Sequence, residues 1–466
     1  MSNENQTDSS IQHPGEESSN VIRQRLTRVE PRTLRTFTPS LALISKSAGS
    51  YHFTPEGRKL ADFSSGVLVS NLGHNPTRWW KRLLDNLGIR NLDERAEFTV
   101  AAPLTAYNAA TELEVEASER LLANIRSAVG GGRMEQVLWA ASGSEAVQKA
   151  LWASMSRDPQ RNIILATRGG FHGKKGLAGA VTGSETDKER DPRVRFISFP
   201  VAECDDLATR REALDLEKYR QELASLDQEL GSQICCLITE PYLGGGGSYH
   251  PQPEYLQMLQ QFCRDHDVIF ILDEIQSNFG RTGPMYAFTH YGIEPDIVCL
   301  GKGLGNGVPV SAAVGRRSIF GGLGYGEGSD TWSANPLSSA AVLATLDEFE
   351  QDDVLARGQE LAAELEAGLQ RLKETGVIVK VRGEGCVWGI ECAGFDHCKP
   401  EQVANLCVEA CYRGDAKGRA IHLLGPLAGK VIRVSPPLVM TVAEAREYLK
   451  VMYGIFSALA AKLVKS

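Results

Sequence analysis

Long apolar runs are missing from this chain of 466 residues. No stretch approaches the ~18 consecutive apolar residues that a helix needs to cross a bilayer, so we expect a cytoplasmic protein without a membrane span. The first twenty residues also lack an apolar stretch, which argues against a secretory signal or a membrane anchor there. Their polar composition predicts a disordered tail over residues 1–20.

Positive charge is scarce as well. The chain has 50 Lys and Arg residues against 58 Asp and Glu, a net charge of −8, whereas a nucleic-acid surface needs concentrated Lys and Arg. Small molecules are therefore the expected ligands. The one basic stretch contains Arg23, Arg25, Arg28, Arg32 and Arg35. A solvated segment or a subunit contact is favoured there over a binding arm.

Cysteine pairs with metal-binding or redox spacing are absent. None of the ten cysteines has a partner at the two-residue gap of a zinc knuckle or a redox dithiol. Cys235, Cys236 and Cys299 lie inside apolar runs, which is typical of reduced core residues. Cys407 and Cys411 are four residues apart, but no histidines stand nearby at ligand spacing. We predict no metal site.

Hydrophobic residues make up 42% of the chain, enough for a large core, and the length predicts two or three domains. Between residues 137 and 315, short apolar runs alternate with turn residues and amphipathic stretches, a pattern typical of an α/β domain. It predicts a sheet of about seven mainly parallel strands with helices on both faces. The runs span residues 137–140, 162–167, 194–200, 234–240, 268–273, 296–301 and 310–314.

After residue 335 the pattern changes to two long helical segments and then a mixed tail with strand-like runs. This change predicts a second, smaller α+β domain. It should pack closely on the first domain, because no linker rich in Gly, Ser or Pro separates them. The expected organisation is a disordered tail over 1–20, small-domain segments over 21–75 and 335–466, and a large domain over 76–334.

Two polar side chains stand at the ends of apolar runs. Asp273 ends the run VIFILD, and Lys302 follows DIVCLG inside a glycine cluster, 29 residues later (302 − 273). Parallel sheets bind ligands at the carboxyl ends of their strands, so both side chains are expected in one site. An amine and an acid so placed suit pyridoxal 5′-phosphate (PLP), whose aldehyde forms a Schiff base with a lysine and whose pyridinium nitrogen pairs with an acid.

Two further motifs suit a cofactor with a phosphate and an aromatic ring. Ser142, Gly143, Ser144 and Glu145 open a predicted helix with capping-box spacing, and such a turn also presents free backbone N–H groups to an anion. Phe171, in the Phe-His-Gly sequence after the second run, could cover the face of a pyridine ring. Alone, the first motif would be a cap and the second a core residue. Beside the lysine and the acid, the functional interpretation is favoured.

The same residues also occur in other classes of protein. An apolar strand ending in Asp-Glu also occurs in P-loop ATPases, but the nearest match to their phosphate loop, residues 168–175, has Arg168 in place of the first Gly and Lys175 in place of Ser or Thr. No G-x-G-x-x-G follows a strand, which leaves a dinucleotide enzyme without support. A purely structural ion pair of Lys302 remains a minority interpretation because of its glycine-flanked setting.

With these motifs in this order, the chain resembles the class III aminotransferases, PLP enzymes of fold type I, from residues 62–74 to residues 431–438. The resemblance implies that the turn Ser142, Gly143 and Ser144 binds the phosphate and that Phe171 stacks on the ring. It further implies that Asp273 holds the pyridine nitrogen, Gln276 contacts the ring hydroxyl and Lys302 forms the Schiff base.

Two more residues follow from the resemblance. Thr331, four residues before Asn335, matches a threonine that reaches the phosphate of the neighbouring subunit, which implies a homodimer with shared active sites. Arg433 matches the arginine that grips a substrate carboxylate, in the bidentate manner that guanidinium geometry allows.

The chain departs from the family pattern at two positions. Lys174 stands where many members have an arginine that contacts a distal carboxylate or a neighbouring polar group, and a lysine lacks the planar fork of a guanidinium. Gly245 stands five residues after Glu240, where members that alternate between two substrates often carry a glutamate that pairs with the carboxylate-binding arginine. The glycine run at 244–247 is expected to leave room for a bulky or extended donor.

The predicted function is ping-pong transamination from an amino acid or amine to a 2-oxo acid, 2-oxoglutarate or pyruvate. An ω-amino acid of the 4-aminobutyrate type is the leading donor. An aminomutase or racemase on the same scaffold is the alternative, since these enzymes share the cofactor residues, and a non-catalytic binding protein with this fold is a remote third.

Overall fold

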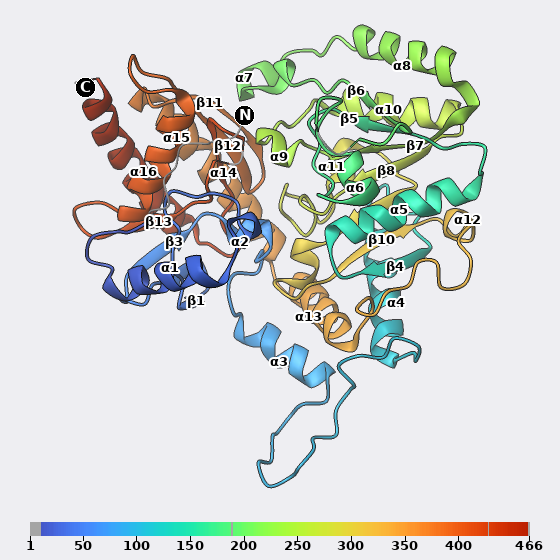
Figure 1. The fold of residues 1–466 in the computed structure, drawn as a ribbon, viewed down its shortest axis with the longest axis horizontal. Helices are drawn as coiled ribbons and strands as arrows, with labels where there is room; N and C mark the ends of the chain where they lie inside the picture. The colour runs from blue at the N-terminus through green and yellow to red at the C-terminus, as the bar shows by residue number, and fades with distance from the viewer. Residues whose placement is uncertain (1–10, 188–189, 427, 465–466) are drawn as a thin grey trace.

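The computed structural model describes residues 11–187, 190–426 and 428–464. Figure 1 shows two parts side by side. One is a layered α/β part formed by the middle of the chain, and the other is a smaller part in which the blue N-terminal segment lies against the red C-terminal elements. Among the described residues, no helix combines the length and the apolarity needed to cross a membrane.

The larger part is built on a sheet of seven strands in the order β4-β10-β9-β8-β7-β5-β6. Strand β10 is antiparallel to both of its neighbours, and the other pairs are parallel. The predicted sheet, with all seven of its strands, is therefore confirmed. The strands are β4 (Gln136–Ala140), β5 (Ile163–Thr167), β6 (Val194–Ile197), β7 (Ile234–Thr239), β8 (Ile269–Asp273), β9 (Ile297–Leu300) and β10 (Ser311–Gly315).

The central strands are buried on both faces, which is why they read as continuous apolar runs. Successive residues of β7 and β8 point to opposite sides, so that Leu237 and Leu272 join one core cluster while Ile238 and Ile271 join another. Helix α5 covers the second face and helix α10 covers the first. The helices of this part include α3 (Thr77–Asn86), α4 (Glu112–Ser127), α5 (Gly143–Arg157), α8 (Glu217–Leu230) and α10 (Pro253–Asp265).

The smaller part contains two sheets. In the four-stranded sheet, β1, β2 and β3 are extended by β13, which pairs in parallel with β3, so the two ends of the chain meet in one sheet. The other sheet has the order β11-β12-β14. The strands are β1 (Lys46–Ala48), β2 (Tyr51–Phe53), β3 (Lys59–Asp62), β11 (Ile378–Glu384), β12 (Val387–Cys392), β13 (Ala420–His422) and β14 (Val431–Val434). The helices around them are α14 (Val354–Arg371), α15 (Pro400–Arg413) and α16 (Val442–Leu463).

Helix α13 (Pro336–Gln351) links the two parts. It packs against α3 and α4 of the larger part and also touches α14 of the smaller one. The domain boundary predicted at residue 335 therefore falls at the start of a shared helix, and the boundaries at 76 and 335 stay a prediction.

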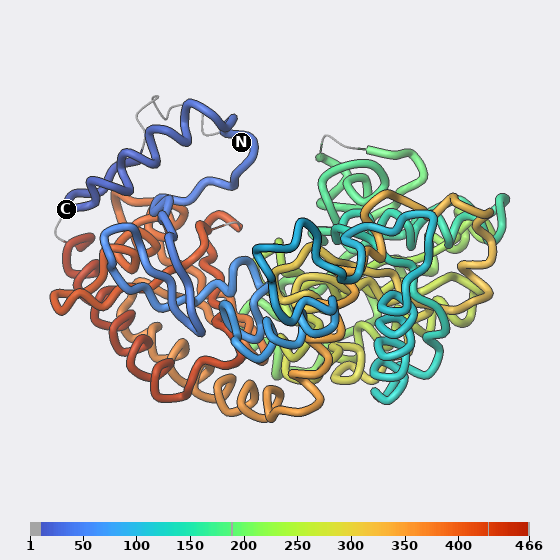
Figure 2. Tube along the Cα trace, turned by 90° about the horizontal axis from the view of Figure 1, so that it is seen from below, coloured from blue at the N-terminus to red at the C-terminus, as the bar shows by residue number. Residues whose placement is uncertain are grey.

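The N-terminal segment is more ordered than its composition predicted. Residues 1–10 lie outside the described residues, but helix α1 (Glu17–Val29) begins inside the expected tail. Glu16 and Arg23 are buried, so the expectation of disorder up to residue 20 and of a solvated Arg23 is wrong for this stretch. Figure 2 shows α1 lying beside the C-terminal elements. The other arginines of the basic stretch, Arg25, Arg28, Arg32 and Arg35, are exposed.

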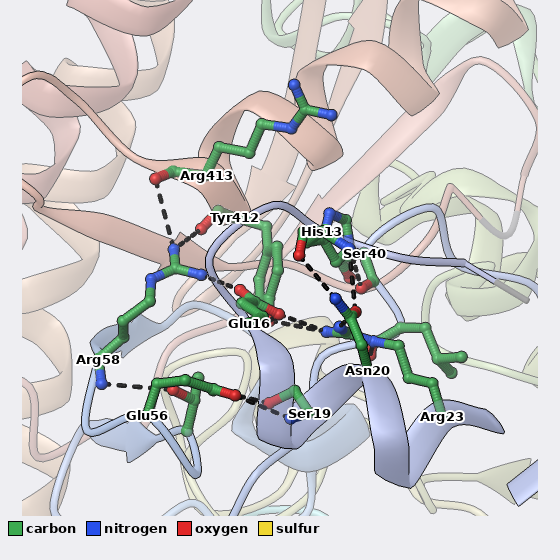
Figure 3. A network of polar contacts seen from close by, with 12 residues as sticks. His13, Glu16, Ser19, Asn20, Arg23, Ser40, Glu56, Arg58, Tyr412 and Arg413 are labelled. Atoms are coloured by element: carbon green, nitrogen blue, oxygen red, sulfur yellow. Dashed lines mark hydrogen bonds and ion pairs between the residues drawn. The ribbon is translucent and has the colours of Figure 1, made fainter. Parts of the chain in front are cut away.

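A buried polar network fastens this helix to the small part (Figure 3). The Arg23 guanidinium lies 2.7 Å from a carboxylate oxygen of Glu16, and that oxygen also accepts a hydrogen bond from the Tyr412 hydroxyl, at 2.9 Å. Arg23 donates further to the carbonyl of Leu41, and Glu16 pairs in addition with Arg58. Each charge is matched because an unmatched one would be costly in the interior.

We expect Glu16→Ala to lower the free energy of unfolding by about 3–5 kcal/mol, because the substitution leaves the Arg23 guanidinium buried without its counter-charge. Denaturant unfolding measures the loss. The matched control is Glu30→Ala, which breaks the exposed pair of Glu30 with Arg35 and should cost at most about 1 kcal/mol. Equal effects of the two substitutions would contradict the structural role of the buried network.

Candidate active site

Lys302 and Asp273 lie at the same edge of the large sheet. Asp273 is the last residue of β8, Lys302 follows the end of β9, and the two strands are parallel neighbours with Asp273 opposite Cys299. Lys302 has φ 47°, in the left-handed region that side chains other than glycine rarely adopt. Such strain, of order 1–3 kcal/mol, persists where surrounding structure enforces it and is concentrated at functional sites.

The carboxylate of Asp273 is held from two sides. One oxygen lies 2.7 Å from Nδ1 of His172, and the other accepts the backbone N–H of Ile275 at 3.0 Å. Both Asp273 and His172 are buried. Nε2 of His172 has no hydrogen-bond partner, although it is buried. A fixed carboxylate at this position is the acceptor that the N–H of a protonated pyridine requires.

Burial and neighbouring charges have opposing effects on the pKa of the Lys302 amine. Burial lowers its pKa, Asp273 acts in the opposite direction, and Arg433 lowers the pKa further. Within the described residues, Lys302 Nζ has no hydrogen-bond or ion-pair partner. A lowered pKa and a free amine are what nucleophilic attack on an aldehyde needs, because only the neutral amine carries the lone pair.

Glu240, Gly244 and Arg433 form a connected chain next to this pair. The backbone N–H of Gly244 donates to the Glu240 carboxylate at 3.2 Å, and the Arg433 guanidinium donates to the carbonyl of the same Gly244. Arg433 is only 7% exposed, and burial lowers its pKa against the opposing effects of Tyr242 and Glu240. A buried guanidinium that rests on a neutral carbonyl is therefore available to an anionic group.

The turn that precedes α5 has the geometry of an anion site. The Ser142 hydroxyl accepts the N–H of Glu145, and the Glu145 carboxylate accepts the N–H of Ser142, so the predicted capping box is confirmed. A Cβ at Gly143 would lie 2.8 Å from Cδ1 of Ile275, so glycine lets the turn pack closely against this side chain. This leaves the N–H groups of Gly143 and Ser144 at the helix N-terminus, where the helix dipole favours a phosphate.

The remaining predicted residues divide into two groups. Phe171 and Gln276 are close to the cluster, since the N–H of Phe171 donates to Glu240 at 2.9 Å and Gln276 accepts from the Tyr242 hydroxyl at 3.0 Å. Lys174 and Thr331 are exposed, and in the described part of the chain no hydrogen bond joins them to the cluster. The roles expected for these last two residues stay predictions.

The glycine run does not leave the open space that the sequence suggested. Gly244–Gly247 form the short helix α9. A Cβ at Gly244 would lie 2.0 Å from the Gln276 side chain, and a Cβ at Gly245 would lie 2.9 Å from Cβ of Phe171. The glycines are needed for close packing of α9 against these two side chains, so the expectation that the run leaves room for a bulky donor is wrong.

Three residues of the site escaped the sequence reasoning. His172 fixes Asp273, Tyr242 holds Gln276, and Ile275 packs beside both Gly143 and Gly301. His172 stands in the Phe-His-Gly motif and Tyr242 directly follows Glu-Pro, so their positions signalled a role. The partners themselves could not be read from the sequence, because they lie up to 101 residues away.

Comparisons with known proteins show the family of this chain. The family model described as "Aminotransferase class-III" matches residues 35–456. The acetylornithine aminotransferase of Agrobacterium fabrum is 29% identical, over 92% of this chain and 97% of that protein. The 4-aminobutyrate aminotransferase GabT of Escherichia coli is 27% identical, over 94% and 98%. The crystal structure of an amine transaminase from an uncultivated Pseudomonas species, in its PLP-bound form, superimposes with a TM-score of 0.76 at 24% identity, covering 98% and 99%.

The fold and the site define a PLP-dependent enzyme of fold type I. The chain belongs to the class III aminotransferase family and is a transaminase. The residues present fit the cofactor, because an ionisable acid, a free amine and the helix N-terminus at Gly143 and Ser144 converge at one sheet edge.

The buried Glu240 carboxyl should make the free energy of unfolding depend on pH. Burial raises its pKa to about 7, while the positive field of His172 acts against this rise. The pKa of Glu240 is higher in the folded than in the unfolded protein. Its contribution to the free energy of unfolding is therefore fully present below the unfolded pKa of about 4.5, and it is lost as the pH rises through about 7. We expect the cofactor-free Glu240→Gln variant to gain about 2 kcal/mol over the wild type between roughly pH 5.5 and roughly pH 8. A difference in unfolding free energy that stays constant with pH would contradict this.

Proposed function

We propose that the enzyme transfers an amino group from an ω-amino acid or amine to 2-oxoglutarate or pyruvate by a ping-pong mechanism. The observation that carries this proposal is the pairing of buried Arg433 with the Gly244 carbonyl in place of an acid. Arg433 then holds the carboxylate of the acceptor in one half-reaction, and returns to a neutral partner when the donor places an uncharged end in the pocket. The 4-aminobutyrate aminotransferase among the relatives fits such a donor.

The cofactor contacts follow from the site. The phosphate is assigned to the N–H groups of Gly143 and Ser144 and to Ser142, one ring face to Phe171, and the ring hydroxyl to Gln276. Ile275, between Gly143 and Gly301, is placed to cover the other ring face. Lys174 is assigned to the outer part of the substrate site, where it acts as a point charge.

Two residues carry the proton chemistry. Bound PLP supplies the electron sink that makes the substrate carbon acidic. Asp273, held by His172, keeps the pyridine nitrogen protonated by offering it a fixed negative charge. Lys302 would hold the cofactor aldehyde and, when its amine is free, would move a proton at the substrate carbon, since this buried amine lies at the same sheet edge as Asp273.

A panel of donors tests the proposal. The purified enzyme is incubated with 4-aminobutyrate, a longer ω-amino acid, a simple amine and an α-amino acid, each with 2-oxoglutarate or pyruvate, and the new amino acid is quantified. We expect the ω-amino acids or the amine to give the highest kcat/KM. Preference for the α-amino acid would overturn the donor assignment. Turnover without any transfer to the added 2-oxo acid would favour the aminomutase or racemase alternative.

We further propose a homodimer with shared active sites. The loop between α3 and α4 projects from the body (Figure 1) and carries large apolar side chains that are more than half exposed, namely Leu92, Phe98, Val100, Leu104 and Tyr107. Thr331 and the exposed Trp332 lie on a turn that Lys149 of α5 anchors through Asp330, at 2.7 Å. Exposed apolar surface of this kind marks a protein interface, and a second copy would cover it.

We expect the double variant Phe98→Glu with Val100→Glu to be monomeric by light scattering and to lose most of its activity and bound PLP. Two buried, unpaired charges would oppose the interface, and each site would lose the partner's threonine. Val464→Glu, on an exposed valine at the end of α16, is the control and should stay dimeric. A monomer with full activity would defeat the shared-site proposal.

A further inference from the structure

A second cluster of ionisable side chains lies on the four-stranded sheet of the smaller part. His52 belongs to β2, Asp62 ends β3, and His74 lies in the segment that follows α2 (Ser65–Leu68). Each offers one potential ligand atom, and the three atoms lie within 4.8 Å of one another. The transamination chemistry does not use these residues.

The two imidazoles converge on one carboxylate oxygen. Nε2 of His74 lies 2.7 Å from Oδ2 of Asp62, and Nε2 of His52 lies 3.5 Å from the same oxygen. In a tetrahedral zinc site, neighbouring ligand atoms are about 3.3 Å apart. A zinc ion would thus replace the hydrogen bond between His74 and Asp62, and the His74 ring would move about 0.6 Å away from that oxygen. The distance from His52 to the same oxygen already matches this spacing, so the His52 ring would hardly move.

Second-layer hydrogen bonds orient two of the ligands. Nδ1 of His52 lies 2.7 Å from the Ser47 hydroxyl, and with Nδ1 as the donor of that hydrogen bond Nε2 carries the lone pair. Oδ1 of Asp62 accepts the N–H and the hydroxyl of Ser64, at 2.8 and 2.6 Å, so that Oδ2 faces the imidazoles. Metal ligands in proteins are usually oriented in this way by the atoms behind them.

Backbone hydrogen bonds hold His74 in place, and the three side chains differ in exposure. His74 is tied to Gly49 by two backbone hydrogen bonds, at 2.8 and 2.9 Å, which fixes the third ligand relative to the strands. The side chains of Asp62 and His52 are 0% and 5% exposed, whereas that of His74 is 13% exposed. An ion could therefore enter beside His74 and be enclosed by the other two.

We propose that His52, Asp62 and His74 form a site for a divalent transition-metal ion, with Zn²⁺ the best-fitting ion and water completing its coordination. Two imidazole nitrogens and one carboxylate oxygen suit Zn²⁺ and its neighbours, whereas Mg²⁺ and Ca²⁺ prefer oxygen alone. The sequence gives no sign of this site, because its ligands are neither cysteines nor closely spaced histidines and only the pairing of β2 with β3 and the bridge from Gly49 to His74 bring them together.

The site has a structural connection to the catalytic turn. The N–H of Leu72 donates to Asn306 at 3.1 Å, and Asn306 donates to the carbonyl of Gly73 at 3.3 Å. Asn306 closes the 3₁₀ turn Lys302–Gly305. Binding at His74 would therefore fix the segment that supports the Lys302 turn, and the ion should stabilise the folded enzyme by mass action.

Metal content of the holoenzyme tests the proposal. Enzyme treated with chelator and then desalted is equilibrated with Zn²⁺, separated from free metal and analysed for zinc, and its thermal midpoint is measured with and without Zn²⁺. We expect one Zn²⁺ per chain and a higher midpoint for the wild type. His397→Gln, on an exposed histidine outside the cluster, is the matched control and should behave like the wild type.

His74→Gln should bind Zn²⁺ on the order of 10²-fold more weakly or not at all, with no Zn²⁺-dependent rise of the midpoint. Its amide can still donate a hydrogen bond to Asp62, so the fold should be kept, as circular dichroism and bound PLP will report. If His74→Gln does not fold, the same zinc and midpoint measurements on His52→Gln test the site, with the same expected loss of binding. Failure of the wild type to retain zinc, or equal zinc content in wild type and variants, would overturn the site. Neither outcome affects the proposed transamination, which the donor panel measures separately.

Discussion

Lys302→Ala should abolish transamination, with kcat lowered by about 10⁴-fold or more, because one side chain provides both the covalent attachment of PLP and the proton transfer. The structure supports this double role, since Lys302 is held in a left-handed backbone conformation beside Asp273 and has no competing partner among the described residues. Borohydride reduction followed by denaturation and peptide mapping measures the attachment. We expect reduced cofactor on the Lys302 peptide of the wild type and none in the variant.

Lys174→Ala is the control for this experiment. Lys174 is also a lysine and lies three residues after Phe171, but it is exposed and makes no hydrogen bond to the cluster among the described residues. Its removal should leave the covalent bond to PLP intact. A Lys302→Ala protein that still carried a full complement of reducible cofactor would show that another amine forms the bond.

The sequence predicted the sheet and the position of the lysine and acid because both depend on local pattern. Strands β7, β8 and β9 are four to six residues long and apolar except for Thr239 and Asp273, the last residues of the first two, and Lys302 stands two residues after the third. Contacts over long sequence separations were not predictable. The hydrogen bond of Tyr412 to Glu16 spans 396 residues, so the burial of the N-terminal segment depends on tertiary packing that no local pattern reports.

The glycine run shows the same limit within the site. Four glycines in a row usually indicate flexibility or open space, since glycine has no side chain to fill it. Here the absent Cβ atoms allow α9 to approach Gln276 and Phe171, and they leave the Gly244 carbonyl directed at Arg433. Composition alone cannot distinguish space left for a ligand from space taken by a neighbouring side chain.

Arg433→Ala should affect the two half-reactions unequally. In the acceptor half-reaction the guanidinium is expected to hold the carboxylate of the 2-oxo acid, and loss of a buried charge-assisted contact costs on the order of 10²-fold in kcat/KM. In the donor half-reaction with an amine that lacks a carboxylate, Arg433 remains on the Gly244 carbonyl, so its removal should matter much less. Single-turnover conversion of the bound cofactor to its amine form, and back, measures each half separately.

Two further variants, at Arg433 and at Gly245, distinguish the effect of the positive charge from that of the local geometry. Arg433→Lys keeps the charge but loses the planar fork, and should retain only part of the acceptor-side rate. Gly245→Glu would place an acid where family members carry one, but its Cβ would lie 2.9 Å from Cβ of Phe171, so we expect weaker PLP binding and no restored switch.

Equal loss in both half-reactions of Arg433→Ala would mean that the donor also needs the guanidinium. In that case the donor carries a carboxylate at its near end, and an α-amino acid becomes the better substrate assignment.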